Sequence, residues 1–447
     1  MKHISSYGIE FKNYHSAVKR TVELYRASVN YLSQIVLDNW DEISDKETIL
    51  LKKQHIERMV HGTSKRTARC DFDVRFPKFP SYLRRSAIAD AVGAVSSFKS
   101  NYKNWVETGS VGNPPVFGVD RDVCPCFYRG NMFRFLGADK AEIKVFDNND
   151  WVWRTVRLKR TDVRYLDKRM RVNKTASLSA PVIEKKHQDH YFLRFTVTED
   201  VELSDKLVFN QRVCAVDLGL NTDATCSVID VHGTVIARKF INCAREKDSV
   251  TNALHRVSVF QKLHGSHDSG RLWSVVKRRN NNHANLVSHE IVEFAREQNC
   301  DVIVFEYLKT NGRKHGSKKQ RLHHWKHKGI QKTTESLAHK YGMRISHVCA
   351  WNTSRLAYDG SGAVKRGRAV NENNPYDVCQ FTSKKMYNCD LSASYNIGAR
   401  YFIRTLLNEF PDITAEVPGI GCGTQRTLSD LWRINNAIEQ EIHNVLS

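Results

Sequence analysis

The sequence lacks any long apolar run. No stretch of its 447 residues approaches the roughly 18 apolar residues that indicate a membrane-spanning helix. The N-terminal segment MKHISSYGIEF also lacks the apolar core of a signal peptide. We therefore predict a cytoplasmic protein with no membrane partner. Its length allows two or three domains, each with its own core.

Acidic residues are comparatively scarce. Asp and Glu number 48 against 69 Lys and Arg, which leaves a formal net charge of +21. This imbalance indicates a polyanionic partner, and without a membrane segment we favour nucleic acid. The positive charges are spread along the chain, as expected for a protein that follows a long phosphate backbone.

CxxC pairs are absent, although the chain has 11 cysteines. An odd number of cysteines without a secretion signal predicts reduced thiols. Zinc knuckles use closely spaced cysteine pairs. Cys124 and Cys126 are separated by a single proline, which is too tight for such a knuckle. We interpret this pair as structural.

The first part of the chain is mostly helical. Residues 1–12 contain one predicted strand, and a helical module follows over 13–108. Helices are predicted at 18–36, 44–60 and 81–105. In the first of them, apolar residues recur at alternating spacings of three and four, which is the pattern of one helix face. Ser44 and Glu47 predict a capping box for the second.

Residues 109–210 change to alternating patterns after the turn-rich segment GSVGNPPVFG. Alternation with period two predicts the strands of an antiparallel, barrel-like domain. We expect the strand within 1–12 to pair with these strands, so that the helical module is an insertion.

Residues 211–447 show a third pattern. Three strands are followed by helix, strand, helix, strand and helix, which is the order of an RNase H-like fold. The predicted fold class is therefore α/β and multi-domain, with an RNase H-like domain after a barrel-like domain that contains a helical insertion.

Three acidic residues lie at the ends of predicted elements. Asp217 ends the strand in AVDLG, Glu306 ends the strand in VFEYL, and Asp390 begins a helix. A carboxylate at the end of an apolar strand is costly to desolvate unless it is paired or bound to a cation. Mg²⁺ prefers carboxylate oxygens and water, and two such ions ~3.5–4 Å apart can clamp a phosphodiester. Together the acids predict a two-magnesium catalytic site.

Each acid also has a simpler interpretation. Asp217 could be a turn residue before Gly219, and Glu306 could belong to a structural ion pair. Asp390 could cap its helix by accepting hydrogen bonds from free backbone N–H groups. The three acids in this order, in a basic chain, are a more specific signal than any one of them.

The same segments resemble a known family. AVDLGLNTDAT, VIVFEYLK and CDLSASYNIGAR resemble the three RuvC motifs of TnpB, a transposon-encoded RNA-guided nuclease, and of the compact type V CRISPR effectors. In the third motif the matching residues are Asp390, Ala393, Asn396 and Ile397. Ser392 and Ser394 depart conservatively from the family pattern.

The resemblance implies a domain plan and a set of partners. Residues 1–12 and 109–210 would form a wedge domain, 13–108 a helical recognition module, and 211–447 a RuvC nuclease domain. The implied partners are a guide RNA and a double-stranded target DNA with a short flanking motif. The implied cofactor is Mg²⁺, as two ions.

One segment departs from the family. The family has a zinc ribbon between the second and third motifs, where this chain has residues 345–389. Ala357 and Gly360 stand roughly where the first pair of cysteines would be, and Cys379 and Cys389 are not in CxxC spacing. Two such thiols make a poor tetrahedral site. We predict a metal-free insert that is held by packing and by its basic residues.

Basic residues supply the candidate nucleic-acid contacts. These are Arg84, Arg85, Lys277, Arg278, Arg279, Lys318, Lys319, Arg321 and Trp325. The last four belong to a basic segment after the Glu306 strand, where charge beside an aromatic suits a single strand. That segment could be a lid that feeds a strand to the metals or a basic tether. For any single basic residue, a solvated face is the alternative.

Three functions compete. The first is an RNA-guided DNA endonuclease, since all three acids are present. The second is an RNA-guided DNA-binding protein, repressor-like, with weak or no cleavage. The third is an unguided RNase H-like resolvase or transposase. The sequence leaves open the oligomeric state, the guide RNA and the flanking motif, and whether the protein is transposon-borne or CRISPR-associated.

Overall fold

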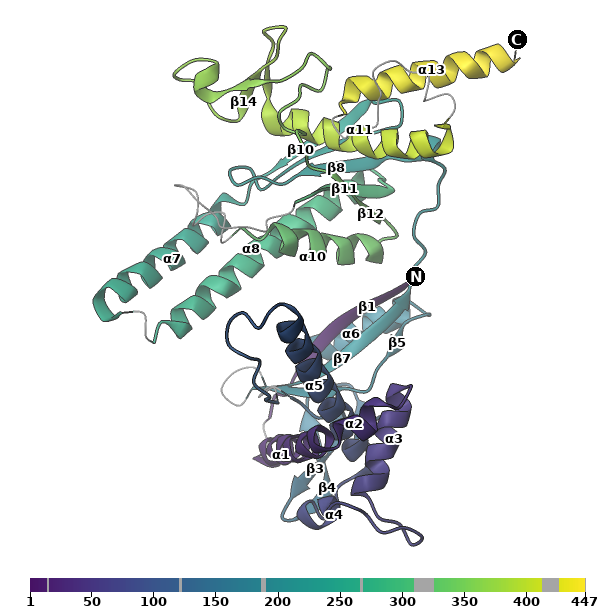
Figure 1. The fold of residues 1–447 in the computed structure, drawn as a ribbon, viewed down its shortest axis with the longest axis vertical. Helices are drawn as coiled ribbons and strands as arrows, with labels where there is room; N and C mark the ends of the chain where they lie inside the picture. The colour runs from purple at the N-terminus through teal and green to yellow at the C-terminus, as the bar shows by residue number, and fades with distance from the viewer. Residues whose placement is uncertain are drawn as a thin grey trace. The chain divides into compact units, whose positions relative to one another are not determined.

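The chain folds into two compact units in the computed structural model. Unit one comprises residues 201–447 with Met1, and unit two comprises residues 2–200 (Figure 1). The structure describes residues 1–13, 16–119, 123–185, 190–265, 268–308, 325–411 and 426–446. Within these ranges, no helix combines the length and apolar character that a membrane crossing requires.

Unit two contains the predicted helical segment. Its helices are α1 (Ser16–Asp38), α2 (Trp40–Ser44), α3 (Ile49–Val60), α4 (Phe72–Arg75), α5 (Ser81–Glu107) and α6 (Arg160–Val172). The predicted periodicity of α1 is confirmed, since Val22, Tyr25 and Val29 on one face are fully or almost fully buried. α1 and α5 pack against each other. Helix α6 was not predicted from the sequence.

The start of α3 differs from the predicted capping box. The side chain of Thr48 accepts a hydrogen bond of 3.2 Å from the backbone N–H of Leu51. Ser44 ends α2 instead of capping the next helix. The prediction of a cap at Ser44 is therefore wrong, because a short extra helix occupies the residues before Thr48.

Two antiparallel sheets complete unit two. One contains β1 (Lys2–Glu10), β5 (Ser177–Leu178), β6 (Val182–Lys185) and β7 (Tyr191–Asp200). The other contains β2 (Phe133–Gly137), β3 (Lys140–Asp147) and β4 (Asp150–Arg157). β1 pairs with β7 along its whole length, so the predicted pairing of the N-terminal strand is confirmed. Helices and strands of this unit share one apolar core.

Unit one is built on a five-stranded sheet. Its strands are β8 (Val213–Asp217), β9 (Ala224–Ile229), β10 (Val235–Ile241), β11 (Val302–Tyr307) and β12 (Arg344–Cys349). The spatial order is β10-β9-β8-β11-β12. β8, β9 and β10 are antiparallel, whereas β11 is parallel to both β8 and β12. The element order is the one predicted for an RNase H-like fold.

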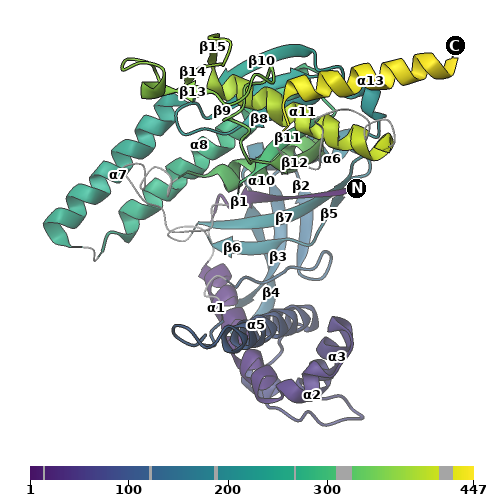
Figure 2. The ribbon, with the colours of Figure 1, turned by 45° about the horizontal axis from the view of Figure 1, so that its top comes forward.

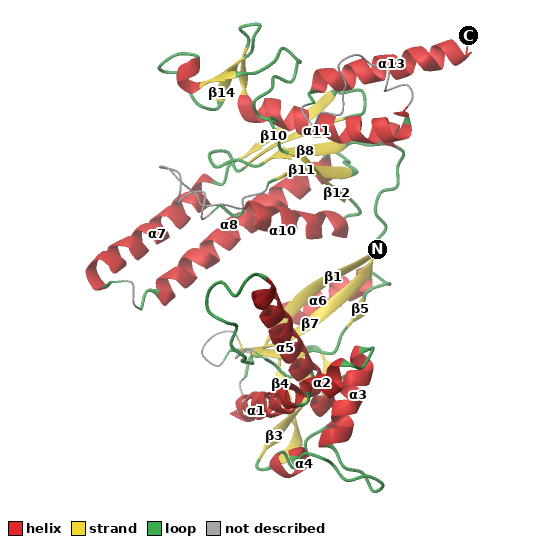
Figure 3. Cartoon of the chain, in the orientation of Figure 1, coloured by secondary structure: helices red, strands yellow, loops and turns green. Residues whose placement is uncertain are grey.

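Helices cover both faces of this sheet (Figure 3). α11 (Cys389–Glu409) and α13 (Leu428–Leu446) lie on one face, and α8 (Gly270–Glu297) and α10 (His327–Lys340) lie on the other. α7 (Ala244–His264) packs along α8. Because successive strand residues point to opposite faces, Ala215 joins the core under α11 while Cys214 and Val216 join the core under α8.

α11 approaches the sheet closely at Gly398. A Cβ atom at this position would lie 2.8 Å from Cδ1 of Ile229 and 3.2 Å from Cβ of Ala215. Only a glycine allows the helix to lie this near the strands. This close contact sets how near the middle of α11 lies to β8 and β9.

A small insert precedes α11. Its three-stranded sheet comprises β13 (Lys365–Arg366), β14 (Val378–Gln380) and β15 (Met386–Asn388), and Figure 2 shows it at the N-terminal end of α11. Its core contains Ala357, Cys379, Phe381 and Cys389. The insert therefore has an apolar centre where a ribbon of this size would hold its metal.

Candidate functional site

Adjacent parallel strands bring two of the predicted acids to one edge of the sheet. Asp217 is the last residue of β8, and Glu306 is the next-to-last residue of β11. The registered pair Val216–Phe305 immediately precedes them. One step further along, each strand therefore presents a carboxylate. Glu306 is 9% exposed.

The third acid comes from α11. Asp390 lies in the first turn of this helix but does not cap it, because Asn388 is the N-cap and accepts a hydrogen bond of 2.9 Å from the N–H of Leu391. The interpretation of Asp390 as a plain helix cap is therefore wrong. Its carboxylate is available for another role.

The three carboxylates share one electrostatic environment. Burial raises the pKa of Asp217 well above its usual range, and the charges of Glu306 and Asp390 raise it further. Burial also raises the pKa values of Glu306 and Asp390. Three such groups repel each other when they are all ionised, and a hard divalent cation with oxygen ligands would remove that repulsion. The three groups therefore have the ligand chemistry that Mg²⁺ prefers.

An arginine of the insert also acts on the acids. The positive charge of Arg366 opposes the upward pKa shifts of Asp217 and Asp390. Its guanidinium also donates a hydrogen bond to the carbonyl oxygen of Ser354. The basic residues of the insert were predicted only as structural charges, because nothing in the local sequence shows that this one faces the acids.

A buried hydrogen-bond network supports Glu306. The hydroxyl of Thr353 donates to the Glu306 carboxylate. Asn396, which is fully buried on α11, donates to the carbonyl oxygens of Thr353 and Leu356, both at 3.0 Å. Its side-chain oxygen accepts from the N–H of Leu428 at 3.2 Å. Asn396 thus connects the helix that carries Asp390 to the segment that holds Glu306.

Arg400 lies one turn further along α11. Its guanidinium donates to the carbonyl oxygens of Cys349 at 2.6 Å and Trp351 at 2.9 Å. Its charge also acts on Glu306 and opposes the effect of burial on the pKa of that carboxyl group. This residue was not predicted from the sequence. The one feature of the sequence that could have indicated its role is that this arginine lies within an otherwise apolar helix face.

The thiols of the insert face an apolar core. The Cys379 thiol donates to the carbonyl oxygen of Tyr387 at 3.4 Å, and the Cys389 thiol donates to that of Tyr376 at 3.8 Å. The neighbouring Cys389 lowers the pKa of Cys379. Ala357 and Phe381 are their core neighbours. A metal ion placed here would find two sulfur ligands, and its other neighbours would be apolar carbon atoms. A metal-free insert remains our prediction on the chemistry of these neighbours.

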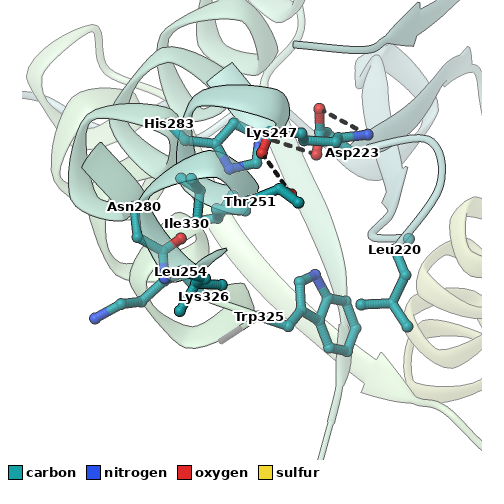
Figure 4. Close-up of a pocket in the computed structure, with 12 residues that line it drawn as sticks. Leu220, Asp223, Lys247, Thr251, Leu254, Asn280, His283, Trp325, Lys326 and Ile330 are labelled. Atoms are coloured by element: carbon teal, nitrogen blue, oxygen red, sulfur yellow. Dashed lines mark hydrogen bonds and ion pairs between the residues drawn. The ribbon is translucent and has the colours of Figure 1, made fainter. Parts of the chain in front are cut away.

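A second cluster of potential ligands lies on the other side of β8. Ligand atoms of Asp223, Cys243 and His283 are all within 4.8 Å of one another. However, Asp223 accepts a 2.7 Å hydrogen bond from the Cys243 backbone N–H, and its oxygens lie 3.0 Å from His283 Nε2 and 3.3 Å from Lys247 Nζ (Figure 4). The Cys243 N–H and Lys247 engage one carboxylate oxygen, and His283 faces the other. We therefore interpret the group as an ion-pair network.

The predicted nucleic-acid contacts fall into different environments. Arg84 is 4% exposed, and its Nη2 lies 2.8 Å from Oε1 of Glu57. This burial contradicts a contact role for Arg84, because its guanidinium is committed inside unit two. The neighbouring Arg85 is exposed. Lys318, Lys319 and Arg321 lie outside the described residues.

The basic cluster of α8 is more accessible. Lys277 and Arg278 are exposed. Arg279 is half-buried and donates a 2.8 Å hydrogen bond to the carbonyl oxygen of Ser249 on α7. Arg278 and Arg279 line a surface hollow of about 410 Å³ together with Arg245. This hollow between α7 and α8 could hold a phosphate backbone. Trp325 is half-buried, and it lines the same pocket as Asp223 and His283.

Comparisons with known proteins show which folds this structure resembles. Residues 5–147 match the Aq_aa04 family. No curated protein matches the chain in sequence. The structure is similar to Cas12f1 in a complex with sgRNA and target DNA, with 15% identity, a TM-score of 0.53 and coverage of 85% of this chain and 81% of that chain.

Larger effectors give weaker similarities. C2c1 of Alicyclobacillus acidoterrestris, in complex with single-guide RNA, has 10% identity and a TM-score of 0.46, over 86% of this chain and 65% of that chain. Cas12i in a crRNA–dsDNA complex has 11% identity and a TM-score of 0.38, over 95% and 64%. The similarity to Cas12f1 confirms that the fold resembles that of the compact type V effectors.

Proposed function

We propose that the protein is an RNA-guided DNA endonuclease that cuts by metal-assisted phosphodiester hydrolysis. The observation that carries this proposal is the shared environment of Asp217 and Glu306, at the carboxyl ends of β8 and β11, and of Asp390, in the first turn of α11. The similar Cas12f1 fold was solved with sgRNA and target DNA. A guide RNA and double-stranded DNA are the partners that we infer for this chain.

The three carboxylates would hold Mg²⁺, which supplies charge for an attacking water and a leaving oxygen at a phosphodiester. The protein's own part is to hold the carboxylates in position. Thr353 orients Glu306 by a hydrogen bond, and Asn396 holds Thr353. Asn388 caps α11 and so leaves Asp390 free of that task.

The domain plan belongs to the same proposal. Residues 211–447 would form the RuvC domain, 1–12 and 109–210 the wedge domain, and 13–108 the helical recognition module. In this plan the wedge domain and the helical module read the short flanking motif. Base pairing with the guide RNA would read the rest of the target.

The substitution Asp217→Ala tests the proposal. With the co-purified RNA, matching plasmid and Mg²⁺, the wild type should cleave, and the variant should lose cleavage while it keeps RNA and target binding. Asp230→Ala is a matched control, because Asp230 lies in the turn between β9 and β10. Undiminished cleavage by Asp217→Ala would exclude the site.

A guided binding protein with weak cleavage is the second candidate. It is favoured by Arg366, whose positive charge acts on both Asp217 and Asp390 and would compete with a metal ion for them. Arg366→Ala separates the two candidates. Cleavage that appears or increases in this variant supports the binding protein, whereas cleavage that is already efficient in the wild type supports the endonuclease.

A further inference from the structure

A half-open cavity lies on the α8 side of unit one, next to the first acidic strand. Its volume is about 150 Å³. Four segments form its wall: the loop after β8, helices α7 and α8, and the start of α10 (Figure 4). Its lining includes Leu220, Lys247, Leu254, Asn280, Trp325 and Lys326.

The size and lining of the cavity suit one flat ring. A cavity of about 150 Å³ with apolar walls accommodates a molecule the size of benzene. Here the apolar side is formed by Leu220, Leu254 and Ile330, with the indole of Trp325 beside them. Asn280 adds an amide, which can both donate and accept hydrogen bonds at the edge of a heterocycle.

The charge of the cavity favours an anionic ligand at Lys326, which lines it. Lys247 also lines it, but its ammonium is paired with Asp223 and donates to the carbonyl oxygen of Asn221 and the side chain of Asn242. Asp223 is the one acid among the described lining residues. The carboxylate of Asp223 is already engaged by Lys247 and His283. The nearby His283 and the hydrogen bond from the Cys243 backbone hold the pKa of Asp223 below its usual range despite burial. An aromatic ring linked to a phosphate fits these surroundings better than a neutral apolar molecule.

The cavity has a fixed relation to Asp217. Gly219, two residues after this acid, lines the cavity. The loop is tight there, since a Cβ atom on Gly219 would lie 2.5 Å from the carbonyl oxygen of Thr222. The N–H of Gly219 also donates to the carbonyl oxygen of Asp223 at 3.3 Å. One short, closed loop therefore joins the acid to the cavity wall.

We propose that this cavity holds one unstacked base of a single-stranded DNA, with the base against Trp325 and the adjoining phosphate near Lys326. The base would anchor the strand beside Asp217. This inference rests on the proposed nuclease function for its choice of DNA. It assigns a binding role to Trp325 that differs from that of the general basic surface.

The test measures binding of a short fluorescein-labelled oligothymidine to the purified full-length protein in EDTA, by fluorescence anisotropy. Trp325→Ala should weaken binding about 5- to 150-fold, the range for loss of one base–aromatic stack. Trp325→Phe keeps a ring and should stay close to the wild type. Trp273→Ala is the matched control, because Trp273 is 38% exposed on α8 and lies outside the cavity lining.

A second variant guards against a folding defect in Trp325→Ala. Thr251 is exposed at the cavity rim, so Thr251→Phe should fill the cavity, keep the melting temperature and weaken binding. An oligothymidine with one abasic position should bind the wild type more weakly than the intact oligothymidine does. For Trp325→Ala the abasic position should cause little further loss of affinity, because both changes remove the same contact.

Three results would overturn the inference. They are equal binding by Trp325→Ala and Trp273→Ala, unchanged binding by Thr251→Phe, and an effect of Trp325→Ala on oligouridine RNA alone. The proposed nuclease function is tested separately, by plasmid cleavage with Asp217→Ala. Cleavage retained by Asp217→Ala would refute the nuclease site and leave the binding result standing.

Discussion

Asn396 donates a hydrogen bond of 3.0 Å to the carbonyl oxygen of Thr353. Through this bond, the helix that carries Asp390 is tied to the residue whose hydroxyl binds Glu306. Two acids that are far apart in the sequence thus depend on one buried amide for their relative position.

Asn396→Ala should reduce both stability and cleavage. The substitution leaves the buried partners at Thr353, Leu356 and Leu428 without the side chain that binds them. Each buried polar group left unsatisfied costs about 1–3 kcal/mol. With three such groups, urea unfolding should show a loss of at least about 3 kcal/mol. The exposed Asn281→Ala should unfold like the wild type, and equal unfolding of both variants would contradict the network.

The acids should make the metal-free protein less stable as pH rises. Their folded-state pKa values are raised, so the folded state binds protons more tightly than the unfolded state. The stabilisation is present below the unfolded pKa values, near 4, and is lost as pH rises through the higher folded values. Unfolding in EDTA should therefore show lower stability at pH 7.5 than at pH 5, to a smaller extent in Asp217→Asn.

The same pKa shifts predict the effect of Mg²⁺. Because a metal binds the ionised carboxylates, its binding must release protons and must strengthen as pH rises. Adding Mg²⁺ at pH 7.5 should raise the melting temperature of the wild type. The melting temperature of Asp217→Asn should respond less. An equal response of both proteins, or a weaker response at higher pH, would contradict magnesium binding at these acids.

Two glycine substitutions should have opposite effects. Gly398→Ala places a Cβ atom 2.8 Å from Ile229 and should cost about 1–3 kcal/mol through overpacking. A Cβ atom on Gly93, in α5, would have nothing within 4 Å, so Gly93→Ala should stabilise its helix by up to about 1 kcal/mol. Calorimetry of the two variants measures both effects. Stabilisation by Gly398→Ala would show that α11 can move away from the sheet.

Arg84 and Arg85 are neighbours with different expected roles. Arg84→Ala removes a buried partner of Glu57 and should destabilise unit two by about 3 kcal/mol. Arg85→Ala should leave unfolding unchanged and weaken nucleic-acid binding if this exposed side chain contacts a phosphate. Urea unfolding and filter binding distinguish the two. Wild-type stability of Arg84→Ala would restore it as a candidate contact.

The sequence was most informative where structure is local. The face of α1 could be read from its periodicity, and β8 and β11 from apolar runs that end at Asp217 and Glu306. Both acids could therefore be assigned to strand ends before the fold was known. Helix caps were less predictable, since Ser44 and Thr48 are both good capping residues and the short α2 decides between them.

Partners that are distant in the chain were not predictable. Nothing near Arg84 distinguishes it from Arg85 except that one faces Glu57 and the other solvent. Likewise, Arg366 and Arg400 are ordinary basic residues until the fold brings them to the acids. Their roles depend on tertiary contacts across many residues, for which a single sequence holds no periodic signal.

The insert before α11 is anchored at both of its ends. Asn396 holds the carbonyl oxygen of Leu356, where the insert leaves the domain, and Asn388 caps α11, where the chain returns. A shorter linker or a grafted foreign module between these two anchors should leave the positions of the acids intact while it removes the charge of Arg366 beside them. The protein therefore offers a built-in attachment point for engineering a reporter or an additional binding domain.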